Sequence, residues 1–402
     1  MNLVPFSAKY LRLNEPLPFG LRDADGRLLL AAGHLVEGPT QLAELTAQPL
    51  YAAESEAAEW NRRLAAATDA AIRGGASLQQ VASVRPDLTT KEASAAPAPV
   101  KLAEQWGELA TALDAALREM RPGSDWRTRL FAVHGQERQL AQRQGDASLY
   151  HLIYEAGTVT QKYCCRHALL VTLIAEQAAA VLGWSQGWID SLGRAALTMN
   201  VAMMRLQDQL AVGDQRISDA MRAEIKGHAE AGARRLLDAV LGDALAIEVV
   251  RLHHDSGDAD QALAELAPER RLARLLRRVD IYAAKISCRA TRQPMSPLQA
   301  AREACLGPGG VPDEIGGALL KAVGLYPPGS FVQLVSGEVG IVVARGRRAN
   351  LPYVASLVSA SGMPLGEPAL RDTLGARHAV KGAVAAHLVK VRPQHERLLA
   401  LM

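Results

Sequence analysis

The sequence predicts a mainly α protein with a small α/β module at its N-terminus and a small β module at its C-terminus. Short apolar runs alternate with turn residues over residues 1–60, and apolar residues recur at steps of three and four through the middle of the chain. After Pro328 the apolar period changes to two. The chain has 402 residues, of which 49% are hydrophobic types, so it can bury more than one core.

The N-terminal module is expected to cover residues 1–82. The runs PLPFGLRD and RLLLAAGHLV flank a turn at residues 24–26 (ADG), which predicts a β-hairpin. Residues 54–73 follow with a helical pattern. Residues 83–100, SVRPDLTTKEASAAPAPV, are rich in Pro, Ser and Ala with little to bury, so we expect a flexible linker there.

The predicted all-α domain covers residues 101–328. Its first helix places apolar residues at helical spacing, namely Leu102, Trp106, Leu109, Leu113, Leu117 and Met120. The predicted β module covers residues 329–402. There FVQLVSGEVGIVVARG predicts a hairpin that turns at Ser336 and Gly337, and LPYVASLVSASG predicts a third strand.

Composition excludes several classes of protein. The net charge is +3, from 45 basic and 42 acidic residues, so we expect no nucleic-acid partner. The four cysteines lack CxxC spacing, which argues against a disulfide framework or a zinc cluster. The N-terminus lacks the pattern of a secretory signal and no apolar run has the ~18 residues of a membrane span, so a cytoplasmic location is expected.

Histidines are concentrated in the predicted helical domain, where four of the ten in the chain lie between residues 167 and 254. They are His167 in YCCRHALLV, His228 in IKGHAEAG, and His253 with His254 in VVRLHHDSG, and Asp280 follows in LLRRVDIYAA. A single histidine on an apolar helix is usually a core residue. Taken together, imidazoles and a carboxylate from separate helices can converge in a bundle core to hold divalent metals.

The order of these stretches resembles the HD-GYP family, bacterial phosphohydrolases of the HD superfamily that cleave cyclic di-GMP. The likeness extends from about residue 163 to 338, and it implies an HD-type helical bundle. It also implies that the metal ligands are His167, His228, His253, His254 and Asp280. Arg274, Arg289 and Arg292 stand where the family carries arginines near phosphate, and guanidinium groups match phosphate oxygens well.

The sequence departs from the family at the central ligand pair. LTMNVAMM occupies the place of the family's HD dipeptide, so Met199 replaces the His and Asn200 replaces the Asp. The GYP signature is absent as well. Hydrolysis with two metals needs an anionic oxygen to bridge the cations, and a neutral amide or a soft thioether does this poorly. We therefore expect that the catalytic residues are lost at these two positions.

Two alternatives remain for the five retained residues. They could hold one divalent transition metal (Fe, Mn, Ni or Zn), or they could form a buried hydrogen-bonded cluster without metal, in which a neutral histidine donates to Asp280. The arginines of the stretch RRLARLLRRVD also have an alternative to phosphate binding, because arginines in such a pattern usually form the solvated face of a helix.

Three functions follow from these residues. The first is a catalytically degenerate signalling protein that binds cyclic di-GMP or a protein partner, and it is our main expectation. The second is a residual metal-dependent phosphodiesterase that uses the remaining ligands. The third is an inert structural adaptor. We expect no enzymatic activity unless the second holds.

Overall fold

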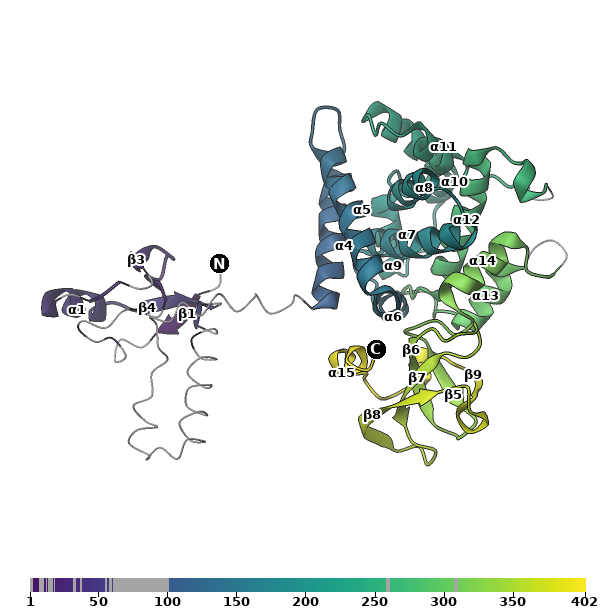
Figure 1. Cartoon of the computed structure of the whole chain (residues 1–402). Helices are drawn as coiled ribbons and strands as arrows, with labels where there is room; N and C mark the ends of the chain where they lie inside the picture. The colour runs from purple at the N-terminus through teal and green to yellow at the C-terminus, as the bar shows by residue number, and fades with distance from the viewer. Residues whose placement is uncertain are drawn as a thin grey trace. The chain divides into compact units, whose positions relative to one another are not determined.

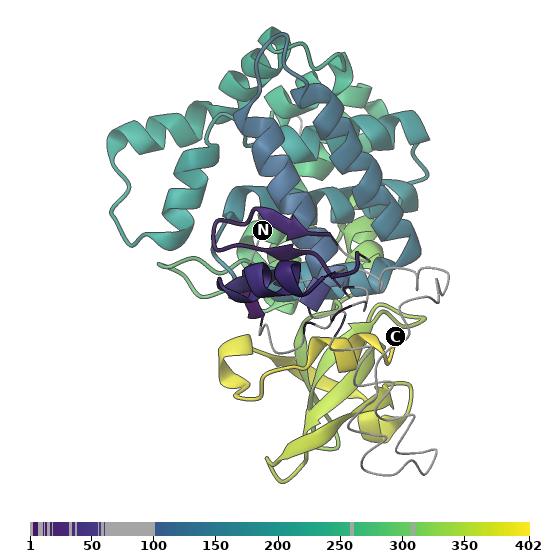
Figure 2. The ribbon, with the colours of Figure 1, turned by 90° about the vertical axis from the view of Figure 1, so that its left-hand side faces the viewer.

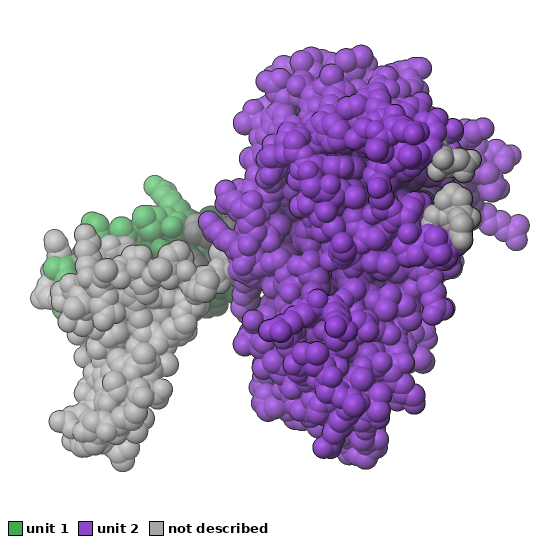
Figure 3. All heavy atoms as spheres, turned by 45° about the vertical axis from the view of Figure 1, so that its right-hand side comes forward, with its two compact units in different colours: residues 1–99 green, residues 100–402 purple. Residues whose placement is uncertain are grey.

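The computed structural model describes residues 101–257, 261–306 and 310–402, together with residues 3–6, 11, 13, 17, 19–31, 34–36, 38–54, 56–57 and 60. The chain divides into two compact units, residues 1–99 and 100–402, which Figure 3 colours separately. The predicted linker 83–100 and most of the predicted helix 54–73 lie outside the described residues.

The first unit contains a small antiparallel sheet with the strand order β1-β4-β2-β3. Its elements are β1 (Leu3–Phe6), β2 (Leu21–Arg22), β3 (Leu28–Leu30), α1 (Pro39–Thr46) and β4 (Leu50–Ala53). The predicted hairpin is confirmed, because β2 pairs with β3 and Gly26 takes the positive φ of 83° that its turn requires. Leu21 and Val36 are fully buried in the small core of this unit.

The second unit begins with helices, as predicted (Figure 1). The helical elements are α4 (Leu102–Arg118), α5 (Trp126–Arg143), α6 (Gly145–Thr158), α7 (Tyr163–Val181), α8 (Gln186–Thr198), α9 (Met204–Val212), α10 (Asp219–Asp238), α11 (Ala244–Leu252), the 3-10 turn η2 (Leu263–Glu265), α12 (Pro268–Ile286), α13 (Pro297–Cys305) and α14 (Glu314–Val323). The apolar positions predicted for the first helix form the buried face of α4, except Met120, which is buried just beyond the end of this helix.

Helix α7 lies at the centre of this bundle. It packs against α8, α12 and α14, and most of its residues are buried because apolar side chains surround the whole helix. By length and composition alone α7 could cross a membrane, but 78% of its most apolar window is buried inside the helical domain. Among the described residues it is the single helix that passes this test, and its burial is typical of a core helix.

The chain then enters an antiparallel sheet with the strand order β8-β7-β6-β5-β9. Its elements are β5 (Phe331–Leu334), β6 (Val339–Ala344), β7 (Tyr353–Val358), β8 (Pro364–Asp372), η3 (Ala376–His378), β9 (Val380–Val384), η4 (Ala386–Leu388) and α15 (His395–Leu399). The predicted hairpin of β5 and β6 is confirmed, and Gly337 takes a φ of 88° in its turn. The predicted third strand is β7.

The β module, drawn in yellow-green below the helices in Figure 2, packs against α6, which Figure 1 labels beside β6. Tyr150 of α6 is buried in the core of the sheet and its hydroxyl lies 2.8 Å from Nδ1 of His395. The Arg345 guanidinium, just after β6, donates to Asp146 at the start of α6. The fold is therefore mainly α with a small sheet near each end, which is the fold class that the sequence predicts.

Candidate metal and nucleotide site

A pocket of about 400 Å³ opens in the helical domain between α7, α9, α10 and α12. Its wall contains most of the predicted site residues. The lining residues are His167, Asn200, Met203, Leu206, Gln207, Leu210, Ile225, Lys226, His228, His254, Asp280, Ala284 and Arg289. We call His167, His228, His253, His254 and Asp280 the pocket cluster.

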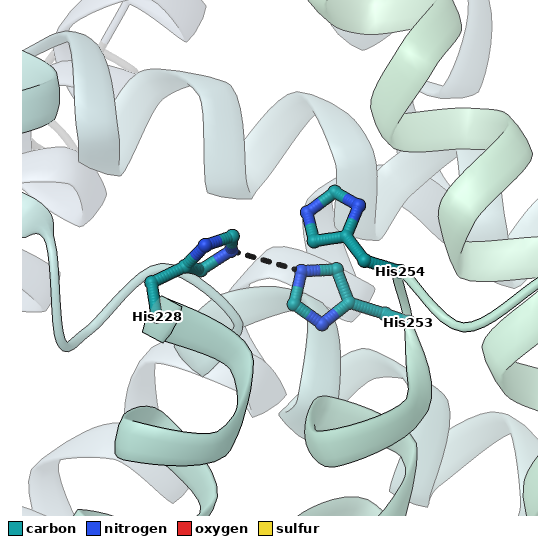
Figure 4. Close-up of side chains that lie close together, drawn as sticks. All are labelled: His228, His253 and His254. Carbon is teal, nitrogen blue, oxygen red and sulfur yellow. Dashed lines mark hydrogen bonds between the residues drawn. The ribbon is translucent and has the colours of Figure 1, made fainter. Parts of the chain in front are cut away.

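Helices α10 and α11 place two imidazoles of the pocket cluster so that a ring nitrogen of each points toward the other (Figure 4). His228 lies in the middle of α10, whose N-terminus is capped by the Ser218 side chain, and His253 is the C-cap of α11. Both side chains are buried, and their Nε2 atoms lie 3.2 Å apart. Nδ1 of His228 lies 2.6 Å from the Ile225 carbonyl, and Nδ1 of His253 lies 2.6 Å from the Val250 carbonyl.

These carbonyl contacts decide what the two Nε2 atoms can do. A carbonyl only accepts, so each Nδ1 must carry a proton, and in a neutral imidazole the other nitrogen then presents a lone pair. Two lone pairs that face each other cannot form a hydrogen bond. They require a shared proton or a cation between them, and carbonyl groups behind the ligating histidines are the usual arrangement in metal sites. The pair of His228 and His253 therefore fits a metal.

His254 completes this group, because one ring nitrogen from each of the three histidines lies within 4.8 Å of the others. Burial and the neighbouring His254 lower the pKa of His253 to about 3, and burial also lowers the pKa of His254. These two imidazoles are thus neutral near pH 7, which is the state that binds a metal.

His167 and Asp280 form a second pair on the pocket wall. Nε2 of His167 donates to Oδ1 of Asp280 over 2.7 Å. Burial is the largest influence on Asp280 and opposes its charge, but the hydrogen bond from His167 together with the charges of His167, His253 and His254 lowers the pKa of the carboxyl to about 2. Nδ1 of His167 is buried without a hydrogen-bond partner among the described residues. The metal-free alternative includes such a hydrogen bond from a histidine to Asp280.

Asn200 and Met199 lie at the corner between α8 and α9 but face different surroundings. Asn200 is 5% exposed and lines the pocket, and its carbonyl accepts the backbone N–H of Met203. Met199, the C-cap of α8, is fully buried in the hydrophobic core and does not line the pocket. Asn200 therefore shares the pocket with the histidines, whereas Met199 contributes to packing.

The three predicted phosphate-binding arginines are not equivalent. Arg289 lines the pocket, where it donates to the Tyr163 hydroxyl at 3.0 Å and lies 4.9 Å from the centre of the Tyr163 ring. Arg274 donates to the Gln261 carbonyl at 2.9 Å, and Arg292 donates to the Ala284 carbonyl. Neither of these two lines the pocket.

Three residues of the site were not among the predicted site residues. Tyr163 stacks on His167 at a ring distance of 5.5 Å and connects it to Arg289. Gln207 and the exposed Lys226 line the pocket itself, whereas Tyr163 does not. The sequence indicates only the position of Tyr163, because it precedes His167 by about one helical turn.

Comparisons with known proteins give a sequence relative and a similar structure. No family model matches the chain. Over 204 residues, the chain is 28% identical to the cyclic di-GMP phosphodiesterase PA4108 of Pseudomonas aeruginosa, a match that covers 50% of this chain and 49% of that protein. The chain thus spans about half the length of the curated relative it matches. Bd1817, an HDG"Y"P protein from Bdellovibrio bacteriovorus, matches with a TM-score of 0.43 and 15% identity, over 80% of this chain and 99% of its own.

The sequence relative lends support to the likeness that the ordered histidine stretches predict. Over half of its length, this chain is therefore similar in sequence to part of a cyclic di-GMP phosphodiesterase.

Proposed function

We propose that this chain is a catalytically degenerate HD-GYP-like signalling protein of the bacterial cytoplasm, which binds cyclic di-GMP in the pocket or presents the domain to a protein partner. The position of Asn200 carries the proposal. It lines the same pocket as His167, His228, His254 and Asp280. The family's bridging carboxylate would stand there, and an amide lacks the negative charge that holds two cations together.

The pocket offers complementary charge to a phosphodiester. Arg289 and Lys226 both line it, and its volume of about 400 Å³ lies in the range of small-molecule sites. A guanidinium group can bind phosphate oxygens with two parallel hydrogen bonds. The guanidinium group of Arg289 is positioned by its hydrogen bond to the Tyr163 hydroxyl. Arg274 and Arg292 remain proposed phosphate contacts, but each would first have to release the carbonyl to which it donates.

A residual metal-dependent phosphodiesterase is the second candidate, and the His228 and His253 pair favours it. Their facing Nε2 atoms, with His254 beside them, provide ligands of the kind that Fe, Mn, Ni or Zn accepts. His167 and Asp280 would add ligands from the other wall. When bound, a metal would polarise a phosphate oxygen as a Lewis acid.

One set of measurements separates these functions. The purified chain is assayed for metal content, for cyclic di-GMP binding by calorimetry and for the linear dinucleotide product by chromatography. The proposal expects binding in the micromolar range and no product. Arg289→Ala is expected to weaken binding by at least tenfold, because it removes the bidentate contact. Arg222→Ala, an exposed arginine of α10 outside the pocket, is the control and should bind normally.

Other outcomes would reject the proposal. Two equivalents of Fe or Mn together with hydrolysis of cyclic di-GMP would show that the site is catalytic in spite of Asn200. No binding of cyclic di-GMP and no metal would reject nucleotide binding in the pocket and would leave a protein partner or the inert adaptor.

A further inference from the structure

A second group of metal-ligating side chains lies outside the pocket, between α5 and α7. We call His134, Glu137 and Glu176 the α5–α7 cluster. His134 and Glu137 are three residues apart on the buried face of α5, and Glu176 meets them from α7. Nε2 of His134 lies 2.5 Å from Oε1 of Glu176, and one ligand atom from each of the three residues lies within 4.8 Å of the others.

The side chains of this cluster are buried, but not all of their polar atoms have hydrogen-bond partners among the described residues. His134 is 4% exposed, Glu137 is 0% exposed and the Glu176 side chain is 11% exposed. Both carboxylate oxygens of Glu137 lack a hydrogen-bond partner among the described residues. A buried carboxylate with no partner is costly, so a group that is present in the folded protein is expected to satisfy it.

The nearby Arg138 guanidinium does not provide a hydrogen-bond partner for Glu137. The Arg138 side chain lies 3.7 Å from Oε2 of Glu176 and also donates to Asp190 at 2.5 Å. One guanidinium is thus divided between two carboxylates of other residues, and the contacts it makes do not include Glu137. The charge of Arg138 acts on Glu137 without direct contact, so both oxygens of this carboxylate stay without a hydrogen-bond partner among the described residues.

Helix α8 has a glycine, Gly193, where it packs against the contact between His134 and Glu176. At Gly193 an added Cβ would overlap Oε1 of Glu176 and Nε2 of His134, and it would lie 2.9 Å from Cε1 of His134. Residue 193 is in the interior of α8, where glycine is unfavourable for the helix. The absence of a side chain at this position gives the imidazole and the carboxylate their place.

We propose that the α5–α7 cluster binds one divalent transition-metal ion, with Zn²⁺ as the best match, and that this ion ties α5 to α7. One imidazole nitrogen and two carboxylates form a donor set that Zn²⁺ accepts, and helical bundles use Glu and His three residues apart for such sites. The ion would neutralise Glu137 and Glu176.

This site is separate from the pocket cluster. Glu176 follows His167 by nine positions on α7, roughly 13 Å along the helix axis. Two metals that act on one substrate stand about 3.5 to 4 Å apart, so the proposed ion serves structure and not the pocket chemistry.

The test counts zinc in a full-length protein whose pocket cluster has been disabled. His228→Ala with His253→Ala removes the two facing imidazoles of the pocket. This variant is stripped with a chelator, incubated with ZnCl₂, dialysed and measured by mass spectrometry of the metal. We expect about one equivalent of zinc per chain, and a melting temperature that rises by about 5 °C with zinc.

Glu137→Gln is then added to the same background, because glutamine keeps the shape of the side chain and removes its charge. We expect the zinc and the zinc-dependent rise in melting temperature to be lost. Glu108→Gln, at an exposed position of α4, is the matched control and should keep both. Circular dichroism confirms that each variant is folded.

A folded background protein that retains no zinc would overturn the proposal and would show that a proton satisfies the cluster instead. Zinc that stays in the Glu137→Gln variant at the control level would also overturn it. Neither result depends on whether cyclic di-GMP binds in the pocket, so the proposed function is tested separately.

Discussion

The pocket cluster and the α5–α7 cluster are both groups of titratable side chains in one helical domain, yet their surroundings differ. The pocket cluster borders a space of about 400 Å³, and main-chain carbonyls orient His228 and His253. The α5–α7 cluster is covered by α8, with Gly193 against its ligand atoms. The first can meet a ligand as large as a nucleotide, whereas the second is packed too closely at Gly193 for a ligand of that size.

The comparison teaches that burial of titratable groups does not by itself identify an active site. Each cluster contains a group with a strongly shifted pKa, namely His253 and Asp280 in the pocket cluster and Glu137 in the α5–α7 cluster. The two clusters differ in whether a substrate can reach them, and a substrate must reach the groups that act on it. The following predictions test this difference from the largest expected effect to the smallest.

Replacing the glycine beside each cluster should have opposite effects. Gly193→Ala should lower the free energy of unfolding by about 3 kcal/mol, because its methyl group would displace Glu176 and His134 from a packed site. Gly227→Ala, next to His228 on α10, meets no atom within 4 Å and should raise stability by about 0.5 kcal/mol through helix propensity. Urea unfolding at pH 7 measures both. Equal effects would show that the α5–α7 cluster is not close-packed.

The pH dependence of stability should also differ in sign. The pKa of His253 falls from 6.5 to about 3 on folding, so its contribution is complete above pH 6.5 and is lost as the pH falls towards 3. Between pH 7 and 4.5 this amounts to about 2 kcal/mol. Burial, aided by the charge of Glu176, raises the pKa of Glu137 well above 4.5, so its contribution is complete below pH 4.5 and is lost as the pH rises.

The measurement is urea unfolding at pH 7 and pH 4.5 in the presence of a chelator. On acidification His253→Gln should lose less stability than the parent protein, and Glu137→Gln should lose more. The pKa of Asp280 falls from 3.8 to about 2, so its contribution changes only below this range. His387→Gln, an exposed histidine of the β module, should change nothing. Shifts of the same sign in the two cluster variants would contradict the comparison.

A carboxylate restored to the pocket should increase metal uptake and should lower stability only when metal is absent. Asn200→Asp places a charge on a residue that is 5% exposed, so the metal-free protein should lose about 1.5 kcal/mol of stability. With Fe²⁺ or Mn²⁺ present, metal uptake should rise and the loss should be recovered. Asn350→Asp, at an exposed position, is the control. If the Asn200→Asp variant folds but its metal uptake stays constant, Asn200 does not occupy the place of a metal ligand.

Met199, unlike Asn200, does not line the pocket, so a ligand restored at this position should not reach a metal there. It is fully buried in the hydrophobic core, so Met199→His would bury an imidazole among apolar side chains. We therefore expect the double replacement to be less stable than Asn200→Asp alone and to bind no more metal.

The sequence could predict the fold because local patterns dominate it. The spacing from Leu102 to Leu117 defines the buried face of α4, and the change of period after Pro328 coincides with the β module. Order along the chain led to four residues that line one pocket: His167, His228 and Asp280 from three separate helices, and His254 just after α11.

The α5–α7 cluster was not predictable in the same way. His134 and Glu137 look like polar residues of an amphipathic helix, and their meeting with Glu176 depends on how α5 packs against α7 and α8. The direction of Arg274 also depends on tertiary structure, because its partner is a main-chain carbonyl 13 residues away. Spacing within one helix carries no information on either contact.

The smallest expected effect concerns the edge of the pocket, where Tyr163 connects His167 to Arg289. Tyr163→Phe keeps the ring that stacks on His167 but removes the hydroxyl that accepts from Arg289. The guanidinium group then loses one restraint, so we expect cyclic di-GMP affinity to fall about threefold, or about 0.7 kcal/mol. Calorimetry measures this beside Tyr154→Phe, a tyrosine of α6 outside the pocket. A loss as large as that of Arg289→Ala would mean that the Tyr163 hydroxyl contacts the ligand itself, and the pocket would then recognise the nucleotide through this tyrosine.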